Sequence, residues 1–256
     1  MSNWDSEQYL KFIRERTQPA VDLANRIPLQ QPRTILDIGC GPGNSTQVLA
    51  DRFPDAQITG ADNSENMIQK ARSLYPSLNF ILFDADSGFD ALHERYDIVF
   101  SNACIQWIPD HHRLLRNMMG LLKPGGVLAI QTPMNDHEPI HAIITALAKS
   151  EKWKHRFAHP RVFHNLTQEA YFDLLSELSS DFFFWQTTYL HRMPSHESIM
   201  DWYKGTGLRP YLSALEPEEA ALFEQEVYRE VVQAYPKQRN GEIIFRFPRF
   251  FFTAVK

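Results

Sequence analysis

The chain of 256 residues is longer than one typical domain of roughly 100–200 residues and too short for two full-sized enzyme domains. It has 26 lysines and arginines against 31 aspartates and glutamates, and this net charge of -5 argues against a nucleic-acid-binding protein, which needs a basic surface. An apolar content of 43% is typical of a globular protein, and no apolar run approaches the roughly 18 residues of a membrane-spanning helix.

The N-terminal segment and the cysteines indicate the compartment. Residues 1–16 carry charges where a secretory signal would need an apolar stretch. Cys40 and Cys104 are the two cysteines and allow one disulfide at most. The side chain of Cys40 is small and weakly polar, so we interpret it as a packing residue. We therefore expect a cytoplasmic protein with free thiols.

The first half of the chain alternates short apolar runs with helical segments, after a helical lead-in over residues 5–26 that we expect to be interrupted at Pro19. The predicted strands are residues 33–38, 57–62, 79–83, 96–101 and 127–131. The predicted helices between them are residues 45–52, a segment that begins after Ser64, and residues 112–122. This alternation predicts parallel βαβ units and therefore an α/β fold with a doubly wound, Rossmann-like sheet.

The pattern changes after residue 133. Residues 138–180 have a helical pattern, residues 181–190 form an aromatic, strand-like run, and residues 195–235 read as a helical insertion before a last strand over 242–252. Two late strands separated by helices predict an antiparallel C-terminal edge on a mostly parallel sheet. No linker-like segment divides the chain, so we expect a single domain over 1–256, with a core at 30–133 and elaborations at 1–29 and 134–256.

The most informative segment is the turn after the first strand, with the sequence LDIGCGPGNS. Glycines let a ligand approach the backbone closely, because they have no Cβ. The dinucleotide pattern G-x-G-x-x-G is absent, since its last glycine would fall on Asn44 or on Thr46. A phosphate-binding P-loop is also excluded, because no Gly-Lys-Ser/Thr follows.

Two acidic residues narrow the choice of ligand. Asp37 leads into the glycine turn, where a carboxylate would repel a pyrophosphate but suit an ammonium group. Asp62 ends the second strand, where a carboxylate can accept hydrogen bonds from both hydroxyls of a ribose. An amino-acid cation joined to a ribose without phosphate describes S-adenosylmethionine. The alternative, a tight turn with two acids that cap helices, remains open at this point.

The spacing Asp37-x-Gly39-x-Gly41-x-Gly43, followed by Asp62, resembles the class I S-adenosylmethionine-dependent methyltransferases. Three weaker segments extend the resemblance over residues 30–133, namely the sequences FDAD, YDIVFSN and LLKPGG. The resemblance implies a Rossmann-like transferase with S-adenosyl-L-methionine as its cofactor. The cofactor-binding residues that it implies are Asp37, Gly39, Gly41, Asp62, Asn63, Met67, Asp84, Ala85 and Asn102.

Within this set the resemblance assigns particular parts of the cofactor to particular residues. Asp84 and Ala85 would recognise the exocyclic amine and the edge of the adenine, and Met67 would pack against its ring. Asn102, at the end of the fourth strand, would face the methionine part. For Met67, packing against the sheet as an ordinary helix residue is the alternative.

The segments outside the core must select the methyl acceptor, because function depends on sites added to a common fold. The loop after the fourth strand lacks the Asn-Pro-Pro-Tyr run of amide and adenine N-methyltransferases. Residues 191–210, the lead-in with Trp4 and Tyr9, and the tail 245–250 resemble a group of the family that esterifies one carboxylate of a small tricarboxylic acid. The resemblance thus implies a carboxyl O-methyltransferase that forms a monomethyl ester.

A substrate with several carboxylates needs fixed positive charge, and arginine offers the two-pronged geometry that lysine lacks. Arg209 follows a Gly-Thr-Gly turn, and Arg246 lies among aromatic residues, where an unpaired guanidinium would be costly to bury. We predict that these two arginines bind substrate carboxylates; the alternative is that they form surface ion pairs. The predicted substrate-binding residues are Arg209, Arg246, Tyr203, Trp202 and Gln106.

The chemistry of a carboxylate acceptor requires no general base, because a carboxyl group with a pKa of about 4 is already ionised near neutral pH. We therefore predict no catalytic acid or base and interpret His111 and His112 as surface residues at a helix start. We also predict no metal site, since His155, His159 and His164 have irregular spacing without a nearby carboxylate.

Two further functions remain open. A methyltransferase for another organic acid, or for a phenol or quinone, would share the core, and a phenol acceptor would need a base. A cofactor-binding module without catalysis would also share it. The partner we expect is a small anionic tricarboxylate, with neither nucleic acid nor membrane; the oligomeric state and the carboxylate that is modified stay undetermined.

Overall fold

A computed structural model describes residues 13–157 and 163–256 of the chain. The predicted lead-in residues Trp4 and Tyr9 and the histidine His159 lie outside the described residues. The helices are α2 (Ile13–Asn25), α3 (Asn44–Arg52), α4 (Glu65–Leu74), α5 (His111–Gly120), α6 (Pro139–Lys149), α7 (Gln168–Leu178), α8 (His196–Lys204), α9 (Arg209–Leu212) and α10 (Pro217–Ala234), with short 3-10 helices η1 (Phe89–Ala91) and η2 (Ile105–Trp107). The strands are β1 (Thr34–Ile38), β2 (Gln57–Asp62), β3 (Asn79–Leu82), β4 (Tyr96–Asn102), β5 (Leu122–Pro133), β6 (Phe182–Met193) and β7 (Ile243–Val255).

The strands form one seven-stranded sheet with the order β3-β2-β1-β4-β5-β7-β6. The first five strands pair in parallel, and β7 pairs antiparallel with both β5 and β6. The predicted α/β fold, with a doubly wound parallel sheet and an antiparallel C-terminal edge, is confirmed. The order reverses at β1 and β4, and in such sheets the ligand binds outside the carboxyl ends of the strands at that reversal.

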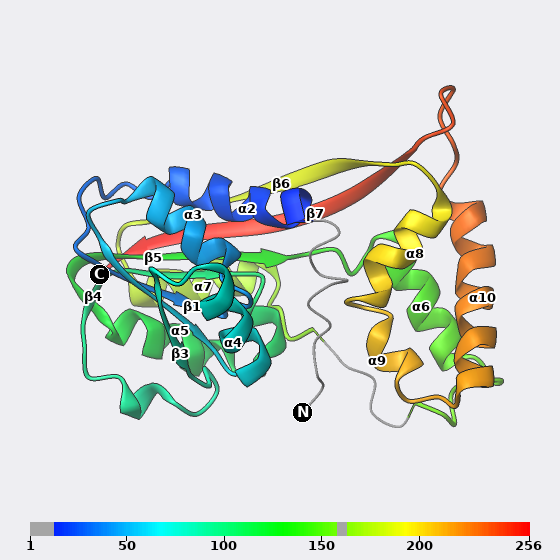
Figure 1. Ribbon diagram of the computed structural model, residues 1–256, viewed down its shortest axis with the longest axis horizontal. Coiled ribbons are helices and arrows are strands. Elements are labelled where there is room, and N and C mark those ends of the chain that lie inside the picture. The colour runs from blue at the N-terminus through cyan, green and yellow to red at the C-terminus, as the bar shows by residue number, and fades with distance from the viewer. Residues whose placement is uncertain (1–12, 158–162) are drawn as a thin grey trace.

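Helices cover both faces of the sheet (Figure 1). On one face, Leu23 of α2 and Leu49 of α3 are buried together with Phe100 of β4. On the other face, Leu115 of α5 and Leu175 of α7 belong to a separate buried cluster. Alternate residues of the central strands supply both clusters, as expected for parallel strands buried on two sides.

A second group of helices, α6, α8, α9 and α10, lies beyond one end of the sheet and is called the cap here. The long strands β6 and β7 run out of the sheet and reach these helices (Figure 1). Trp202 of α8, Phe223 of α10 and Phe245 of β7 form the buried centre of the cap. The cap is thus joined to the sheet by the antiparallel edge, and it stands next to the carboxyl end of β5.

Three predicted elements differ from the structure. The helical pattern over 138–180 splits into α6, which belongs to the cap, and α7, which packs on the sheet through Tyr171. Strand β5 begins at Leu122 rather than at residue 127. Pro19 does not interrupt the lead-in but lies inside α2, because the burial of Leu23 and its neighbours holds the helix together despite the lost hydrogen bond.

Candidate active site

The glycine turn between β1 and α3 places backbone groups at the carboxyl ends of the central strands. Gly39 and Gly41 have φ angles of 77° and 55°, a left-handed conformation that glycine adopts without strain. The amides of Gly39 and Cys40 donate hydrogen bonds to the carbonyl of Ala61 at 2.7 and 3.0 Å. These bonds fix the turn against the end of β2.

A cavity of about 390 Å³ opens beside this turn and is called the glycine-loop cavity here. Strands β1, β2 and β4 end at it, as the topology requires. Eight of the nine predicted cofactor-binding residues line it: Gly39, Gly41, Asp62, Asn63, Met67, Asp84, Ala85 and Asn102. The structure therefore brings together residues that lie on five separate segments of the sequence.

Asp62 is held in a defined orientation at the edge of this cavity. One carboxylate oxygen accepts a hydrogen bond from the amide of Gly41 and the other from the amide of Ser64, both at 2.9 Å. Each oxygen keeps a second acceptor position, so the group can also bind two neighbouring hydroxyls. Burial raises the pKa of Asp62, and the two amide hydrogen bonds lower it.

Asp37 is placed differently from the other predicted residues. Its side chain is fully buried behind the turn, and it is not among the described residues that line the glycine-loop cavity. One of its oxygens accepts hydrogen bonds from the hydroxyls of Ser45 and Thr46 at 2.6 and 2.7 Å, whereas the other oxygen has no partner within the described part of the chain. Burial raises the pKa of Asp37 to about 6, although these two hydrogen bonds lower it.

The glycine-loop cavity fits a ligand with a cationic amino-acid end, a ribose and a flat ring. The amide oxygen of Asn102 is buried without a hydrogen-bond partner in residues 13–157 and 163–256, which leaves an acceptor for an ammonium group. Asp62 offers acceptors for two hydroxyls. Met67 and Phe83 supply apolar walls for a ring, and both are nearly buried in the structure.

The loop after β4 separates this cavity from the rest of the carboxyl edge. His111 links this loop to α7 through two hydrogen bonds of its ring. Its Nε2–H donates to the carbonyl of Ile105 at 2.8 Å, and its Nδ1 accepts from the hydroxyl of Tyr171 at 2.6 Å. Only 1% of His111 is exposed, so the interpretation as a surface residue was wrong for this histidine. Burial lowers the pKa of His111, and a neutral ring suits this pair of hydrogen bonds.

A second, smaller cavity of about 100 Å³ lies on the other side of that loop and is called the arginine cavity here. It shares Asn102, Ala103 and Trp107 with the glycine-loop cavity, so the two spaces meet there. The predicted substrate-binding residues Gln106, Trp202 and Tyr203 all line it. The structure thus places the predicted acceptor residues next to the predicted cofactor residues.

Two arginines that the sequence did not single out line the arginine cavity. Arg16 of α2 donates a hydrogen bond to the carbonyl of Trp202 at 3.4 Å, and its guanidinium lies 5.0 Å from the centre of the Trp202 ring. Arg249 of β7 is 6% exposed, and its guanidinium lies 4.3 Å from the centre of the Phe247 ring. Among the described residues that line this cavity, these two arginines are the charged side chains that are cationic at neutral pH, and no aspartate or glutamate is among them.

The two predicted arginines lie elsewhere. Arg246 is exposed on β7, and Arg209 is partly buried in the short helix α9; neither is among the described residues that line the arginine cavity. Successive side chains of a strand point to opposite faces, so Arg246 and Arg249 cannot face the same side of β7. The alternation Phe247, Arg249, Phe251 was the signal in the sequence that could have identified Arg249.

His141 of α6 also lines the arginine cavity and was not predicted as a site residue. Its ring packs 5.2 Å from the Tyr203 ring and 5.7 Å from the Phe163 ring, centre to centre. Burial lowers the pKa of His141 to about 4, so the ring is neutral near neutral pH. The hydroxyl of Tyr203 accepts a hydrogen bond from the side-chain amide of Asn135 at 3.2 Å.

Metal-binding clusters and membrane-spanning helices are absent from residues 13–157 and 163–256. They contain no group of three or more histidine, cysteine, aspartate or glutamate side chains that could hold a metal ion. Within the same residues, no helix has the length and apolar character to cross a membrane.

Comparison with known proteins identifies the family to which the chain belongs. A family model described as "Methyltransferase domain" matches residues 9–178. The trans-aconitate 2-methyltransferase of Rhodopseudomonas palustris is 43% identical over 258 residues, with all of both chains covered, and that of Escherichia coli O139:H28 is 42% identical over 254 residues, with 99% of this chain and 98% of the relative covered. The chain belongs to the methyltransferase family and, within it, to the group of the trans-aconitate 2-methyltransferases.

A solved structure shows the same fold in a more distant protein. The plantazolicin methyltransferase BpumL, crystallised with a desmethylplantazolicin analogue and S-adenosylhomocysteine, aligns with a TM-score of 0.52 at 20% identity. The alignment covers 97% of this chain and 86% of that one. This likeness supports the doubly wound architecture described above.

Proposed function

We propose that the chain transfers a methyl group from S-adenosylmethionine to one carboxylate of trans-aconitate, giving a monomethyl ester and S-adenosylhomocysteine. The observation that carries this proposal is the arginine cavity, a space lined by two arginines in an acidic protein, which meets the glycine-loop cavity at Asn102 and Trp107. Membership of the trans-aconitate 2-methyltransferase group supports the same substrate.

The cofactor would be held by residues of the core, 30–133. Asp62 would accept hydrogen bonds from the ribose hydroxyls, and Asn102 would accept from the ammonium group with its free amide oxygen. Met67 and the turn at Asp84 and Ala85 would enclose the adenine. Asp37 would act through the field of its buried carboxylate, from behind the glycine turn.

The acceptor would be held mainly by residues outside that core. We assign its carboxylates to Arg16 and Arg249, because both line the arginine cavity and a guanidinium can bind a carboxylate with two parallel hydrogen bonds. Gln106, Trp202 and Tyr203 would bound the rest of the acceptor. This division supports one domain over 1–256, in which 1–29 and 134–256 supply most of the acceptor site.

S-Adenosylmethionine supplies a methyl group bonded to a positively charged sulfur. A carboxylate oxygen of the acceptor would form the new C–O bond as the C–S bond breaks and leaves its electron pair on sulfur. Because the carboxylate is already ionised near neutral pH, no proton would have to be transferred. Arg16 and Arg249 would hold the other carboxylates and thereby fix the reacting oxygen in line with the methyl group. Positioning of this kind and exclusion of water are the sources of rate enhancement that this site offers.

A phenol or a hydroxylated quinone fits the arginine cavity less well as an acceptor, because its hydroxyl group must lose a proton. Among the described residues that line the cavity, His141 and Tyr203 are the titratable side chains besides the arginines. Burial lowers the pKa of His141 to about 4 and raises that of Tyr203, so one is a weak base and the other stays protonated. A carboxylate needs no such base.

The proposed compartment is the cytoplasm. Cys40 and Cys104 are both free thiols, the state that a reducing compartment maintains. Burial raises the pKa of the Cys104 thiol to about 12, so it stays protonated beside the glycine turn.

Incubation with methyl-labelled S-adenosylmethionine and a panel of acids tests the proposed function. We expect base-labile label in trans-aconitate and none in a monocarboxylic acid or a phenol, because only a polycarboxylate can be held at an arginine through one carboxylate while another accepts the methyl group. Cofactor binding without ester formation from any polycarboxylate would refute carboxyl methylation and favour a non-catalytic binding module.

The pKa of Asp37 predicts how cofactor binding depends on pH. The carboxyl is neutral below pH of about 6 and negative above it, and a cationic ligand prefers the negative form. Affinity for S-adenosylhomocysteine, which carries the same ammonium group, should therefore rise about tenfold from pH of about 5 to about 7 and then level off. Calorimetric titration across this range measures the change.

The variant Asp37→Asn is the matched control for this prediction. It keeps the size of the side chain and removes the titrating group, so the pH dependence should become flat and the affinity low throughout. Asp62 also has a raised pKa. If the affinity of Asp37→Asn for S-adenosylhomocysteine still changed with pH as in the original protein, the pH dependence would be assigned to Asp62 instead.

A further inference from the structure

A third cavity, larger than the arginine cavity, lies in the cap and is called the outer cavity here. It has a volume of about 500 Å³, and its described lining includes residues of α6, Gly207 before α9, and the rings of Phe157 and Phe163. The arginine cavity, at about 100 Å³, is smaller than the roughly 300–1,000 Å³ of ordinary small-molecule sites, whereas the outer cavity falls in that range.

The outer cavity continues the arginine cavity. Trp107, His141, Phe163 and Gly207 line both spaces. The rings of Trp107 and Phe163 are 4.7 Å apart, centre to centre, and form part of the wall at the junction. A ligand bound at Arg16 and Arg249 that is longer than a tricarboxylic acid therefore has a route past these rings into the cap.

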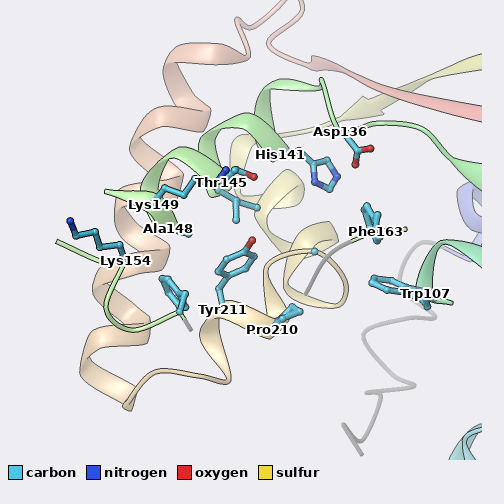
Figure 2. A pocket seen from close by; sticks show the side chains of 13 residues that line it. Trp107, Asp136, His141, Thr145, Ala148, Lys149, Lys154, Phe163, Pro210 and Tyr211 are labelled. Carbon is cyan, nitrogen blue, oxygen red and sulfur yellow. The ribbon is translucent and has the colours of Figure 1, made fainter. Parts of the chain in front are cut away.

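The two ends of the outer cavity differ in charge. Figure 2 shows Trp107, Phe163 and Asp136 at one end and Lys149 and Lys154 at the other. Lys154 forms an ion pair with Glu151 at 2.7 Å, whereas Lys149 has no ion-pair partner in the described part of the chain. An anionic group would therefore be repelled at the Asp136 end and attracted at the Lys149 end.

The wall between these ends is mostly apolar. Ile144 and Ala148 of α6 are nearly buried there, and Pro210 and Tyr211 of α9 lie opposite them (Figure 2). Such a wall suits methylene groups, each of which gains about 0.8 kcal/mol on leaving water. Thr145 lines the cavity from the same helix and faces the Tyr211 hydroxyl (Figure 2).

We propose that the outer cavity is a second subsite of the acceptor site, which takes the alkyl arm of a longer carboxylic acid and binds a terminal anionic group at Lys149. The substrate class would then include dicarboxylic acids with an alkyl substituent, methylated by the same transfer to a carboxylate oxygen. This inference rests on the proposed function, since one carboxylate of these acids would be held by Arg16 or Arg249 while the other accepts the methyl group.

Methylation of a series of alkylsuccinic acids of increasing chain length tests the subsite. The kcat/KM should rise about three- to fourfold for each methylene that enters the cavity and then stop rising when the arm fills it. A terminal carboxylate on the arm should raise kcat/KM further, and Lys149→Met should abolish this additional gain. Lys152→Met is the matched control, because Lys152 pairs with Glu226 and is not among the described lining residues.

Two variants that introduce tryptophan on α6 test whether the second subsite lies in the outer cavity. Thr145→Trp should fill the outer cavity and lower kcat/KM for the longest acid at least tenfold, with the value for trans-aconitate changed less than about twofold. Ala146→Trp, at an exposed position of the same helix outside the lining residues, should change neither value.

The outcomes separate the two proposals. Methylation of trans-aconitate without any gain along the alkyl series, or equal effects of the two tryptophan variants, overturns the subsite and leaves the proposed function standing. Failure to methylate any acid, trans-aconitate included, overturns both.

Discussion

Replacement of Arg249 by alanine should raise the KM for trans-aconitate by about 100-fold or more, because a pair of charge-assisted hydrogen bonds contributes roughly 3 kcal/mol or more. Arg249 is 6% exposed and lines the arginine cavity, so its guanidinium is held at the place where the acceptor would bind. Steady-state kinetics at saturating S-adenosylmethionine measure the change. The affinity for S-adenosylhomocysteine should stay within about twofold of the original, which also reports on folding.

Two further variants make this prediction specific. Arg246→Ala removes the same side chain from an exposed position of β7 and should change KM by less than about twofold. Arg249→Lys keeps the charge but not the two-pronged geometry, so its KM for trans-aconitate should lie between the values of Arg249→Ala and the original protein. A large effect of Arg246→Ala together with a small effect of Arg249→Ala would reverse the assignment and restore the sequence-based prediction.

The largest effect on cofactor binding is expected from Gly39→Ala. A Cβ at this position would lie 2.3 Å from both Cβ and Sγ of Cys104, and the φ angle of 77° is one that alanine rarely adopts. The turn must therefore shift away from the loop after β4. We expect the affinity for S-adenosylhomocysteine to fall by about 100-fold or more, measured by calorimetry.

Gly120→Ala is the control for this substitution. Gly120 is exposed at the end of α5, and a Cβ there would meet no atom within 4 Å. Alanine is also the better helix former, so stability should be unchanged or slightly higher. Normal cofactor binding by Gly39→Ala would mean that the turn does not form part of the cofactor site.

The residues of the glycine-loop cavity could be predicted to lie together because their arrangement depends on local rules. The spacing of glycines defines a strand-to-helix turn, and the carboxyl ends of neighbouring parallel strands meet at one edge of the sheet. Asp62 and Asn102 end strands on the two sides of β1, so their proximity follows from the strand order. Pattern and topology together were sufficient to place eight of the nine predicted residues at one cavity.

The lining of the arginine cavity depends on contacts that the sequence pattern does not contain. Arg16 reaches the site because α2 packs against the sheet and extends to Trp202 of the cap, 186 residues away in sequence. Arg249 rather than Arg246 faces the site because of the register of β7 against β5 and β6. His111 was misread for the same reason, since its burial depends on the packing of α7 against α5.

A crystal structure with S-adenosylhomocysteine and trans-aconitate bound tests most directly where the acceptor carboxylate meets the cofactor. We predict one carboxylate within hydrogen-bond distance of Arg249 and a second carboxylate oxygen facing the sulfur between Asn102 and Trp107. Trans-aconitate bound at Arg209 or Arg246, with the arginine cavity vacant, would contradict the proposed site.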